Sequence, residues 1–289
     1  MALTTILGYG NTIKRIIFQY EIMCKKEGEE ELCDFPYLFQ LIEHINSNIN
    51  QYEYPDKTNS KWYGFDKINS NNLLWQVVMA NCKYNYKPNL INITNRAERP
   101  SPKNNDEGDK EKTHLLIYGN VILFEHRRNG TGMYVLCKLL NDAWKTIKSV
   151  IDPRIVKIEA RQILDNNFME IIKKSNRIKG IKIIADSHLI SSDFFNFSED
   201  NGVQEKYSIE IKAKKYHQFN KYTFINRIEK FLTLDQSIDK ITVDLHDEEN
   251  NHRIINTEEF AKRYVINVNK DNNGEVDSYD MFLQMGSLI

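Results

Sequence analysis

Hydrophobic and polar positions alternate with period two in some stretches of the chain and recur with helical spacing in others. β-Branched and aromatic residues dominate Thr12 to Met23, which predicts a strand. Leu and Ile residues recur at helical spacing from Pro36 to Ile49, which predicts a short helix. Asn72 to Lys87 is apolar and alternates towards its end, so we expect a long strand there.

The most regular pattern lies between Thr113 and Trp144. Two apolar runs flank Gly119-Asn120, a dipeptide typical of a β-hairpin turn. The second run ends in a basic, glycine-bearing corner from His126 to Gly132, which we call the basic corner. An amphipathic pattern follows from about Met133 to Val150 and predicts a helix.

The second half of the chain predicts the order strand, helix, strand, strand, helix, strand. That order is the split βαβ, or ferredoxin-like, arrangement. The strands are expected at 154–160, 178–185, 207–213 and 240–245, and the helices at 165–175 and 221–232. A pair of strands (253–256 and 263–269) and a short helix (279–285) are expected to close the chain.

These elements predict an α+β protein with two domains. Residues 1–150 form an N-terminal mixed α/β sheet domain, with a long polar loop at 88–112. Residues 151–289 form a ferredoxin-like (βαββαβ) C-terminal domain, which is followed by the closing strands and helix. The boundary is expected just before Asp152-Pro153.

Composition narrows the classes of function. The 289 residues have a formal net charge of −1, which excludes strong overall attraction to nucleic acid but allows a local basic surface. The N-terminus lacks the pattern of a signal peptide, and no run reaches the ~18 apolar residues that a membrane helix needs. We therefore expect a cytoplasmic protein that does not insert into a membrane.

Cysteine and histidine spacing gives no metal or redox motif. The four cysteines form no C-x-x-C pair, and the seven histidines form no H-x-x-H or H-E-x-x-H motif. We expect no metal site, no cofactor and no catalytic residues. The cluster around His246 and Asp244 lies at an expected strand end, where polar residues are common.

Two basic segments are candidate phosphate-binding sites. In the basic corner, Arg127 and Arg128 with the adjacent glycines could bind a phosphate, although a solvated hairpin end would have the same composition. The second segment reads KAKKYHQFNKY and interleaves basic residues with aromatic ones. A strand end followed by a polar helix start explains that segment equally well. Its candidate contacts are Lys212, Lys214, Lys215, His217, Lys221 and Tyr222.

A third pattern, Glu210-Ile211-Lys212, matches the E-x-K half of a metal-dependent nuclease site. Such a site needs a second carboxylate for Mg²⁺, and the upstream candidates are Asp186, Asp193 and Asp200. However, Glu210 and Lys212 also occupy the polar positions of any half-exposed strand.

The segment from residue 113 to 185, with its hairpin, basic corner, helix and the strand RIVKIEA around Val156 to Ala160, resembles the RexA family of prophage exclusion proteins and related phage-defence proteins. The resemblance extends more loosely to about residue 256. It implies a cytosolic, dimeric protein that binds DNA, senses phage replication intermediates and works with a separate membrane or effector partner. The family offers no catalytic motif.

We therefore predict a non-enzymatic nucleic-acid-binding component of a bacterial or prophage antiviral (abortive-infection) system. The expected ligand is double-stranded DNA rather than RNA, and the protein is expected to be a homo-oligomer. The predicted phosphate contacts are Arg127, Arg128, Lys212, Lys214, Lys215 and Lys221. The alternatives are a Mg²⁺-dependent nuclease of a defence system and a protein–protein interaction scaffold.

Overall fold

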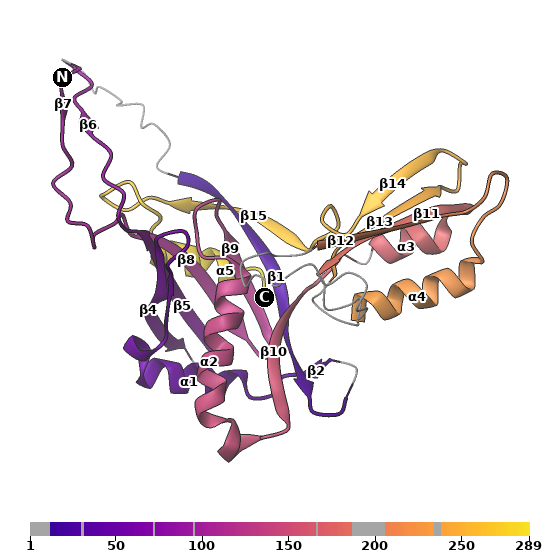
Figure 1. The fold of residues 1–289 in the computed structure, drawn as a ribbon, viewed down its shortest axis with the longest axis horizontal. Helices are drawn as coiled ribbons and strands as arrows, with labels where there is room; N and C mark the ends of the chain where they lie inside the picture. Colours follow the sequence, from indigo (N-terminus) through magenta and orange to yellow (C-terminus); the bar gives the residue numbers. More distant parts are fainter. Residues whose placement is uncertain are drawn as a thin grey trace, which may run out of the picture. The chain divides into compact units, whose positions relative to one another are not determined.

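The computed structural model describes residues 12–29, 32–71, 73–94, 96–165, 167–186, 206–233 and 238–289 (Figure 1). Helices make up 24% of the chain and strands 43%, and the larger sheet is curled and antiparallel. The α+β class predicted from the sequence is therefore confirmed.

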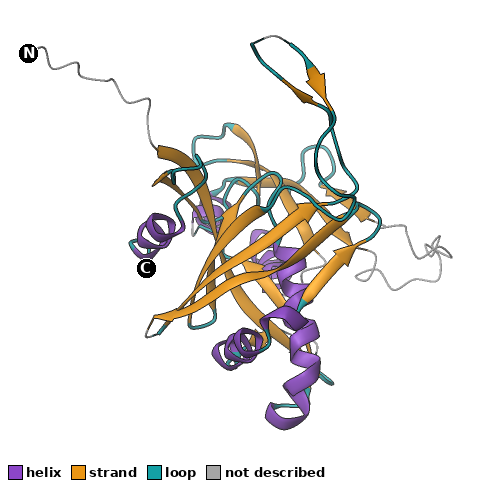
Figure 2. Ribbon diagram, turned by 90° about the vertical axis from the view of Figure 1, so that its left-hand side faces the viewer, coloured by secondary structure: helices purple, strands orange, loops and turns teal. Residues whose placement is uncertain are grey.

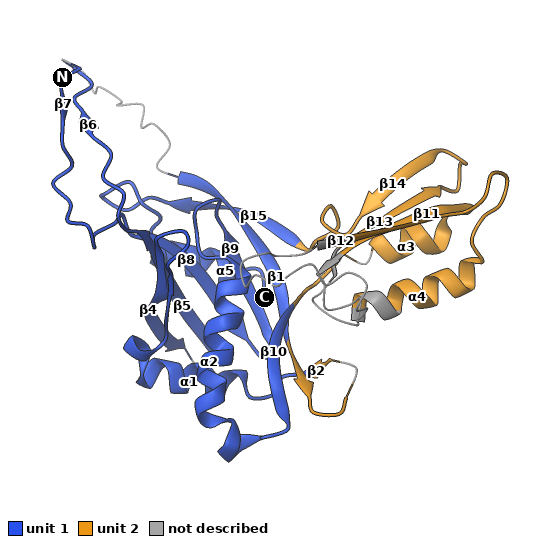
Figure 3. Cartoon of the chain, viewed as in Figure 1, with its two compact units in different colours: residues 1–22, 34–160, 263–289 blue, residues 23–33, 161–262 orange. Residues whose placement is uncertain are grey.

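The chain forms two compact units (Figure 3). Unit 1 contains residues 1–22, 34–160 and 263–289, and unit 2 contains residues 23–33 and 161–262. This division differs from the predicted one, because the chain leaves unit 1 after Ala160 rather than near Val150 and returns to it at Arg263. The closing strand and helix thus belong to unit 1.

The larger sheet has nine strands, in the order β10-β1-β9-β8-β5-β4-β3, and β15 and β2 also pair with β1. Its strands are β1 (Thr12–Lys26), β2 (Cys33–Asp34), β3 (Glu53–Asp56), β4 (Lys61–Asn71), β5 (Leu74–Lys83), β8 (Glu111–Tyr118), β9 (Val121–His126), β10 (Ile155–Gln162) and β15 (Arg263–Asn269). The predicted hairpin is formed by β8 and β9. Gly119 in its turn has φ +57°, which glycine adopts without steric cost.

Helices cover both faces of this sheet (Figures 1 and 2). Helices α1 (Leu38–Ser47) and α2 (Met133–Ile151) pack together on one face, and α5 (Ser278–Gly286) packs on the other. Because side chains alternate along a strand, Leu116 and Leu123 face α5, where they join an apolar cluster with Met281 and Phe282.

Unit 2 contains a four-stranded antiparallel sheet in the order β12-β11-β13-β14. Its elements are β11 (Arg177–Asp186), β12 (Lys206–Lys212), β13 (Ile238–His246), β14 (His252–Asn256), α3 (Asn167–Lys174) and α4 (Lys221–Thr233). Both helices contribute to the apolar core on one face of this sheet, with Phe168 and Ile172 from α3 and Phe224 and Ile228 from α4.

The ferredoxin-like arrangement predicted for the C-terminal half is not confirmed. The six elements occur in the predicted order, but the first strand, β10, belongs to the nine-stranded sheet beside β1. Strand β13 instead pairs directly with β11, and β14 completes the four-stranded sheet. The strand pattern at Ile155–Gln162 specified a strand but not its partner, because pairing depends on residues distant in the sequence.

The predicted loop at 88–112 contains two short paired strands, β6 (Leu90–Ile91) and β7 (Glu98–Arg99), and ends where β8 begins at Glu111. Among the helices in the described part of the chain, none combines the length and apolar character needed to cross a lipid bilayer.

Candidate nucleic-acid interface

The basic corner connects β9 to α2 and is held against the neighbouring strand. The buried Thr113 hydroxyl oxygen on β8 accepts a hydrogen bond from the Thr131 N–H at 2.9 Å. A Cβ atom at Gly130 would lie 2.7 Å from Thr113 Oγ1 and 2.9 Å from Arg127 Cβ. Glycine at this position is therefore required by the close approach of the corner to β8.

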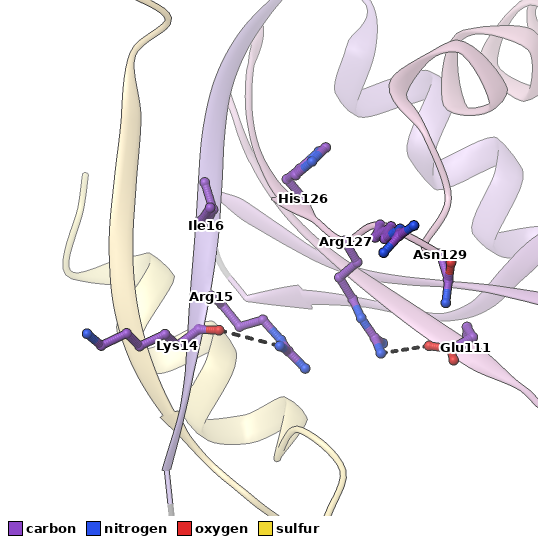
Figure 4. Close-up of a pocket in the computed structure, with 8 residues that line it drawn as sticks. Lys14, Arg15, Ile16, Glu111, His126, Arg127 and Asn129 are labelled. Carbon is purple, nitrogen blue, oxygen red and sulfur yellow. Dashed lines mark hydrogen bonds and ion pairs between the residues drawn. The ribbon is translucent and has the colours of Figure 1, made fainter. Parts of the chain in front are cut away.

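Beside the corner lies a pocket of about 280 Å³, which we call the arginine pocket (Figure 4). Strands β1 and β9 place Ile16 opposite His126, so alternation puts Arg15 and Arg127 on the same face of the sheet. Figure 4 shows the side chains of Arg15 and Arg127 pointing to the same side, whereas Lys14 extends to the other side of β1. The lining residues are Lys14, Arg15, Ile16, Glu111, His126, Arg127, Arg128 and Asn129.

A carboxylate orients each of the two guanidinium groups. Arg15 Nε lies 2.8 Å from Oε1 of the fully buried Glu125. Arg127 Nη2 lies 2.6 Å from Glu111 Oε2, and its Nη1 donates to the Lys112 carbonyl oxygen at 2.7 Å. A guanidinium has five N–H donors in a planar fork, so these contacts fix each group while leaving further donors for a ligand.

The electrostatics of the arginine pocket favour an anion. Burial lowers the pKa of Arg15, Glu125 opposes that effect, and the positive charge of Arg127 lowers the pKa further. The two guanidinium groups therefore repel one another. On the side to which Arg15 points, the permanent cations Arg15, Arg127 and Arg128 number three against the two carboxylates of Glu111 and Glu125, a surplus of one positive charge.

Behind Arg15, a chain of hydrogen bonds runs from Glu125 on β9 through His114 on β8 to Ser278 on α5. Glu125 Oε2 lies 2.7 Å from His114 Nδ1, and His114 Nε2 lies 2.8 Å from the Ser278 hydroxyl. This connectivity is that of a nucleophile triad. Such a triad also needs N–H donors for an oxyanion, but in the first turn of α5 the N–H groups of residues 279 and 280 already donate to Asp277 Oδ1. His114 is itself buried, with the Phe282 ring 5.5 Å away. These contacts, which we call the brace, hold Glu125, and through it Arg15, in place.

Sequence reasoning missed Arg15, Glu125 and the brace. Their signal was present, because Arg15 lies on a predicted strand with β-branched neighbours, and Glu125 interrupts an otherwise apolar strand. A buried acidic residue generally requires a cationic or hydrogen-bonding partner, but only the pairing of β1 with β9 identifies that partner as Arg15.

The four predicted lysines of unit 2 have different environments. Lys212 pairs with Glu210 at 2.8 Å, and this contact lowers the pKa of Glu210 and raises the pKa of Lys212. Lys221 Nζ donates to the Ser175 carbonyl oxygen at 2.8 Å. Lys214 and Lys215 are exposed, and the described residues provide no carboxylate within ion-pair distance of either.

Next to Lys214 and Lys215 is a second pocket, of about 300 Å³, which we call the tyrosine pocket. It is lined by Arg177, Lys179, Tyr216, His217 and Gln218. The sequence did not identify Arg177 and Lys179 as candidate phosphate contacts. They lie at the start of β11, whose many apolar residues indicate only a buried strand.

The six predicted phosphate contacts are divided between the two units. Arg127 and Arg128 belong to unit 1, and Lys212, Lys214, Lys215 and Lys221 belong to unit 2. Arg127 and Lys212 are also paired with carboxylates, so part of their positive charge is compensated within the protein. Arg128, Lys214 and Lys215 remain without an ion pair in the part of the chain that the structure describes.

The geometry around Glu210 gives little support for a nuclease site. Glu210 lies opposite Lys182 on β11, and Asp186 lies four positions further along that strand, ~13 Å away at the rise of a β-strand. Asp193 and Asp200 lie outside the described residues. Over the described ranges, no group of three or more His, Cys, Asp or Glu side chains is arranged to hold a metal ion.

Comparison of the sequence with models of protein families and with curated proteins found no match.

Proposed function

We propose that this protein binds duplex DNA through the phosphate backbone as a non-enzymatic component of a prophage or bacterial antiviral system. The observation that carries the DNA-binding part is the arginine pocket, where two oriented guanidinium groups face the same side with a surplus of positive charge. Phosphate oxygens suit such a fork, because each can accept more than one N–H donor. Lys214 and Lys215 supply additional backbone contacts on unit 2.

The antiviral role rests on the resemblance of residues 113–185 to the RexA family. That segment includes most of β8, all of β9, the basic corner and α2, and it supplies four of the eight residues that line the arginine pocket. The same resemblance implies a homodimer, a cytoplasmic location and a separate membrane or effector partner. Bacteria expressing the protein with its neighbouring genes should plate phage less efficiently than bacteria carrying an Arg127→Gln/Arg128→Gln variant.

The direct test is a DNA-binding titration in which salt is varied. Fluorescence anisotropy of a labelled duplex should give an affinity that falls steeply between about 50 and 200 mM salt. In the variant Arg127→Gln/Arg128→Gln, the slope of log K against log salt should become shallower by about 0.9 for each phosphate that the protein no longer neutralises. Arg127→Lys keeps the charge but removes the planar fork, so it should recover part of the affinity.

A matched control removes the same charge from another part of unit 1. Lys67 is exposed on β4, and Lys145 is an exposed cation on α2 that pairs with Asp142 at 2.8 Å. The variant Lys67→Gln/Lys145→Gln should leave the affinity and the salt slope close to those of the wild type. An equal loss of affinity in both double variants, or an affinity that does not change with salt, would show that the arginine pocket is not a phosphate site.

A further inference from the structure

We propose that the tyrosine pocket of unit 2 binds single-stranded nucleic acid, with the Tyr216 ring stacking on a base and Arg177 and Lys179 contacting the adjacent phosphate. The ligand class rests on the proposed function, but the site is separate from the arginine pocket and lies in the other unit.

The backbone of the turn that carries Tyr216 is well anchored. The Ala213 N–H donates to the Lys179 carbonyl oxygen at 2.8 Å, and the Phe219 N–H donates to the Ile178 carbonyl oxygen at 3.1 Å. Phe219 also packs against the core of unit 2, with its ring 5.4 Å from that of Phe224. The turn between these anchors is therefore a fixed platform at the start of β11.

Tyr216 adopts an unfavourable conformation on this platform. Its φ is +69°, in the left-handed region where a bulky side chain is strained. The side chain is nevertheless 87% exposed, so packing within unit 2 does not explain the choice of tyrosine. A strained residue that presents an aromatic ring to solvent is a feature of ligand-binding sites, where the ligand covers the ring.

Cationic side chains lie beside the ring and line the same pocket. Lys215 Nζ lies 5.2 Å from the centre of the Tyr216 ring, within the range of a cation–π contact. Lys179 Nζ donates to the His217 carbonyl oxygen at 3.0 Å, which fixes that ammonium group in the wall of the pocket. Arg177 is exposed, and the described residues place no carboxylate within ion-pair distance of it.

An acidic turn at 247–249 follows β13. Asn176, next to Arg177, donates to the Glu248 carbonyl oxygen at 2.8 Å, so this turn borders the site. The Asp247 carboxylate accepts N–H groups of its own turn, from residues 249 and 251. The acidic turn therefore bounds the cationic surface on one side. A bound single-stranded nucleic acid would run away from this turn, past Lys214 and Lys215.

An exposed ring flanked by cations suits a single strand better than a duplex. Bases in a duplex already stack on each other and are not available to a protein ring, whereas each base of a single strand has a free face. Stacking on an aromatic side chain tolerates any base, so the site should bind with little sequence preference.

The test compares Tyr216→Asn and Tyr216→Phe with the wild type. Asn accepts a left-handed backbone, so Tyr216→Asn removes the ring without disturbing the turn and should raise the thermal midpoint of unfolding. Binding to a labelled oligothymidylate of about 16 nucleotides should weaken by about 5- to 150-fold, while binding to the corresponding duplex should hardly change. Tyr216→Phe keeps the ring and should bind as the wild type does. Tyr279→Ala, which removes a tyrosine of unit 1 that is 81% exposed, is the matched control.

The outcomes separate this inference from the proposed function. Wild-type binding to duplex but not to the single strand, or unchanged single-strand binding in Tyr216→Asn, overturns the inference and leaves the arginine pocket as the DNA site. An equal loss of affinity for both ligands in Tyr216→Asn also overturns it, since the ring would then not act by stacking. Single-strand binding that depends on Tyr216, without duplex binding that depends on Arg127 and Arg128, supports the inference and refutes the proposed function. No binding to either ligand refutes both.

Discussion

Replacing Glu125 with glutamine should destabilise unit 1 and should do so mainly through Arg15. Glu125 is completely buried, and its carboxylate contacts the Arg15 Nε at 2.8 Å, the His114 Nδ1 at 2.7 Å and the His114 N–H at 3.1 Å. A glutamine side chain has only one oxygen. In either orientation its NH₂ group would therefore face either Arg15 or His114, the two residues that the carboxylate now contacts.

The magnitude follows from the loss of one partner of a buried ion pair. Removing one charge of such a pair typically costs about 3 to 5 kcal/mol, because the other charge is left without compensation. The Arg15 side chain retains 17% of its exposed surface, so it can turn partly towards water and the cost should lie near the lower value. We therefore expect Glu125→Gln to lower the free energy of unfolding by about 3 kcal/mol.

Tryptophan fluorescence during urea unfolding is the appropriate assay. The three tryptophans, Trp62, Trp75 and Trp144, all belong to unit 1, so their signal follows this unit separately from unit 2. Glu111→Gln is the control, because that carboxylate is 34% exposed and its pair with Arg127 should contribute less than about 1 kcal/mol.

A double-mutant cycle identifies the partner. If the cost arises from an uncompensated Arg15, then Arg15→Met combined with Glu125→Gln should be more stable than the sum of the two single changes predicts, by about 1 kcal/mol or more. A decrease in stability below about 0.5 kcal/mol in Glu125→Gln, or strictly additive single effects, would refute the proposed coupling.

Three further predictions address other parts of the molecule. Thr113→Val removes the acceptor of the buried Thr131 N–H and should lower the free energy of unfolding in urea by about 1 to 3 kcal/mol. Thr113→Ser keeps the hydroxyl and should lower it less, and equal losses in the two variants would contradict this. Burial raises the pKa of Cys137 to about 12, so at pH 8 its alkylation, followed by peptide mass spectrometry, should be about a thousandfold slower in the native than in the unfolded protein. Because the folded thiol keeps its proton to higher pH than the unfolded one, Cys137 should also lower the free energy of unfolding as the pH rises from about 9 to 12. Fast alkylation of native Cys137 at pH 8 would refute the raised pKa. Glu210→Gln releases Lys212 from its ion pair and should strengthen duplex binding by up to about fivefold. If the protein were instead a Mg²⁺-dependent nuclease that uses Glu210, the same variant would lose its cleavage activity.

The sequence predicted most elements because their patterns are local. The hairpin at Gly119-Asn120, the helix that follows the basic corner and the strand at 263–269 are all present close to their expected bounds. Turn residues and hydrophobic periodicity act over a few residues, so they can be recognised without knowing the fold. Strand β4 at Lys61–Asn71 was missed, because its Gly, Asp and Asn residues mask the alternation.

The candidate site was predicted only in part, for the same reason. The basic corner is continuous in the sequence, and Arg127 and Arg128 could therefore be identified. Arg15 is more than a hundred residues away, and only the antiparallel register of β1 and β9 places it beside Arg127. Arg177 and Lys179 likewise join Tyr216 only through the hydrogen bonds that anchor the turn after β12 to β11.

The sequence by itself thus determined the α+β class, the order of the elements and the two basic segments, since each depends on the character of neighbouring residues. Only the tertiary structure decided that β10 joins the larger sheet, that the last strand and helix return to unit 1 and that the six predicted cations fall into two units. It also decided which charges are compensated, as at Lys212, because strand pairing and charge compensation depend on distances between residues that the order of the chain does not fix.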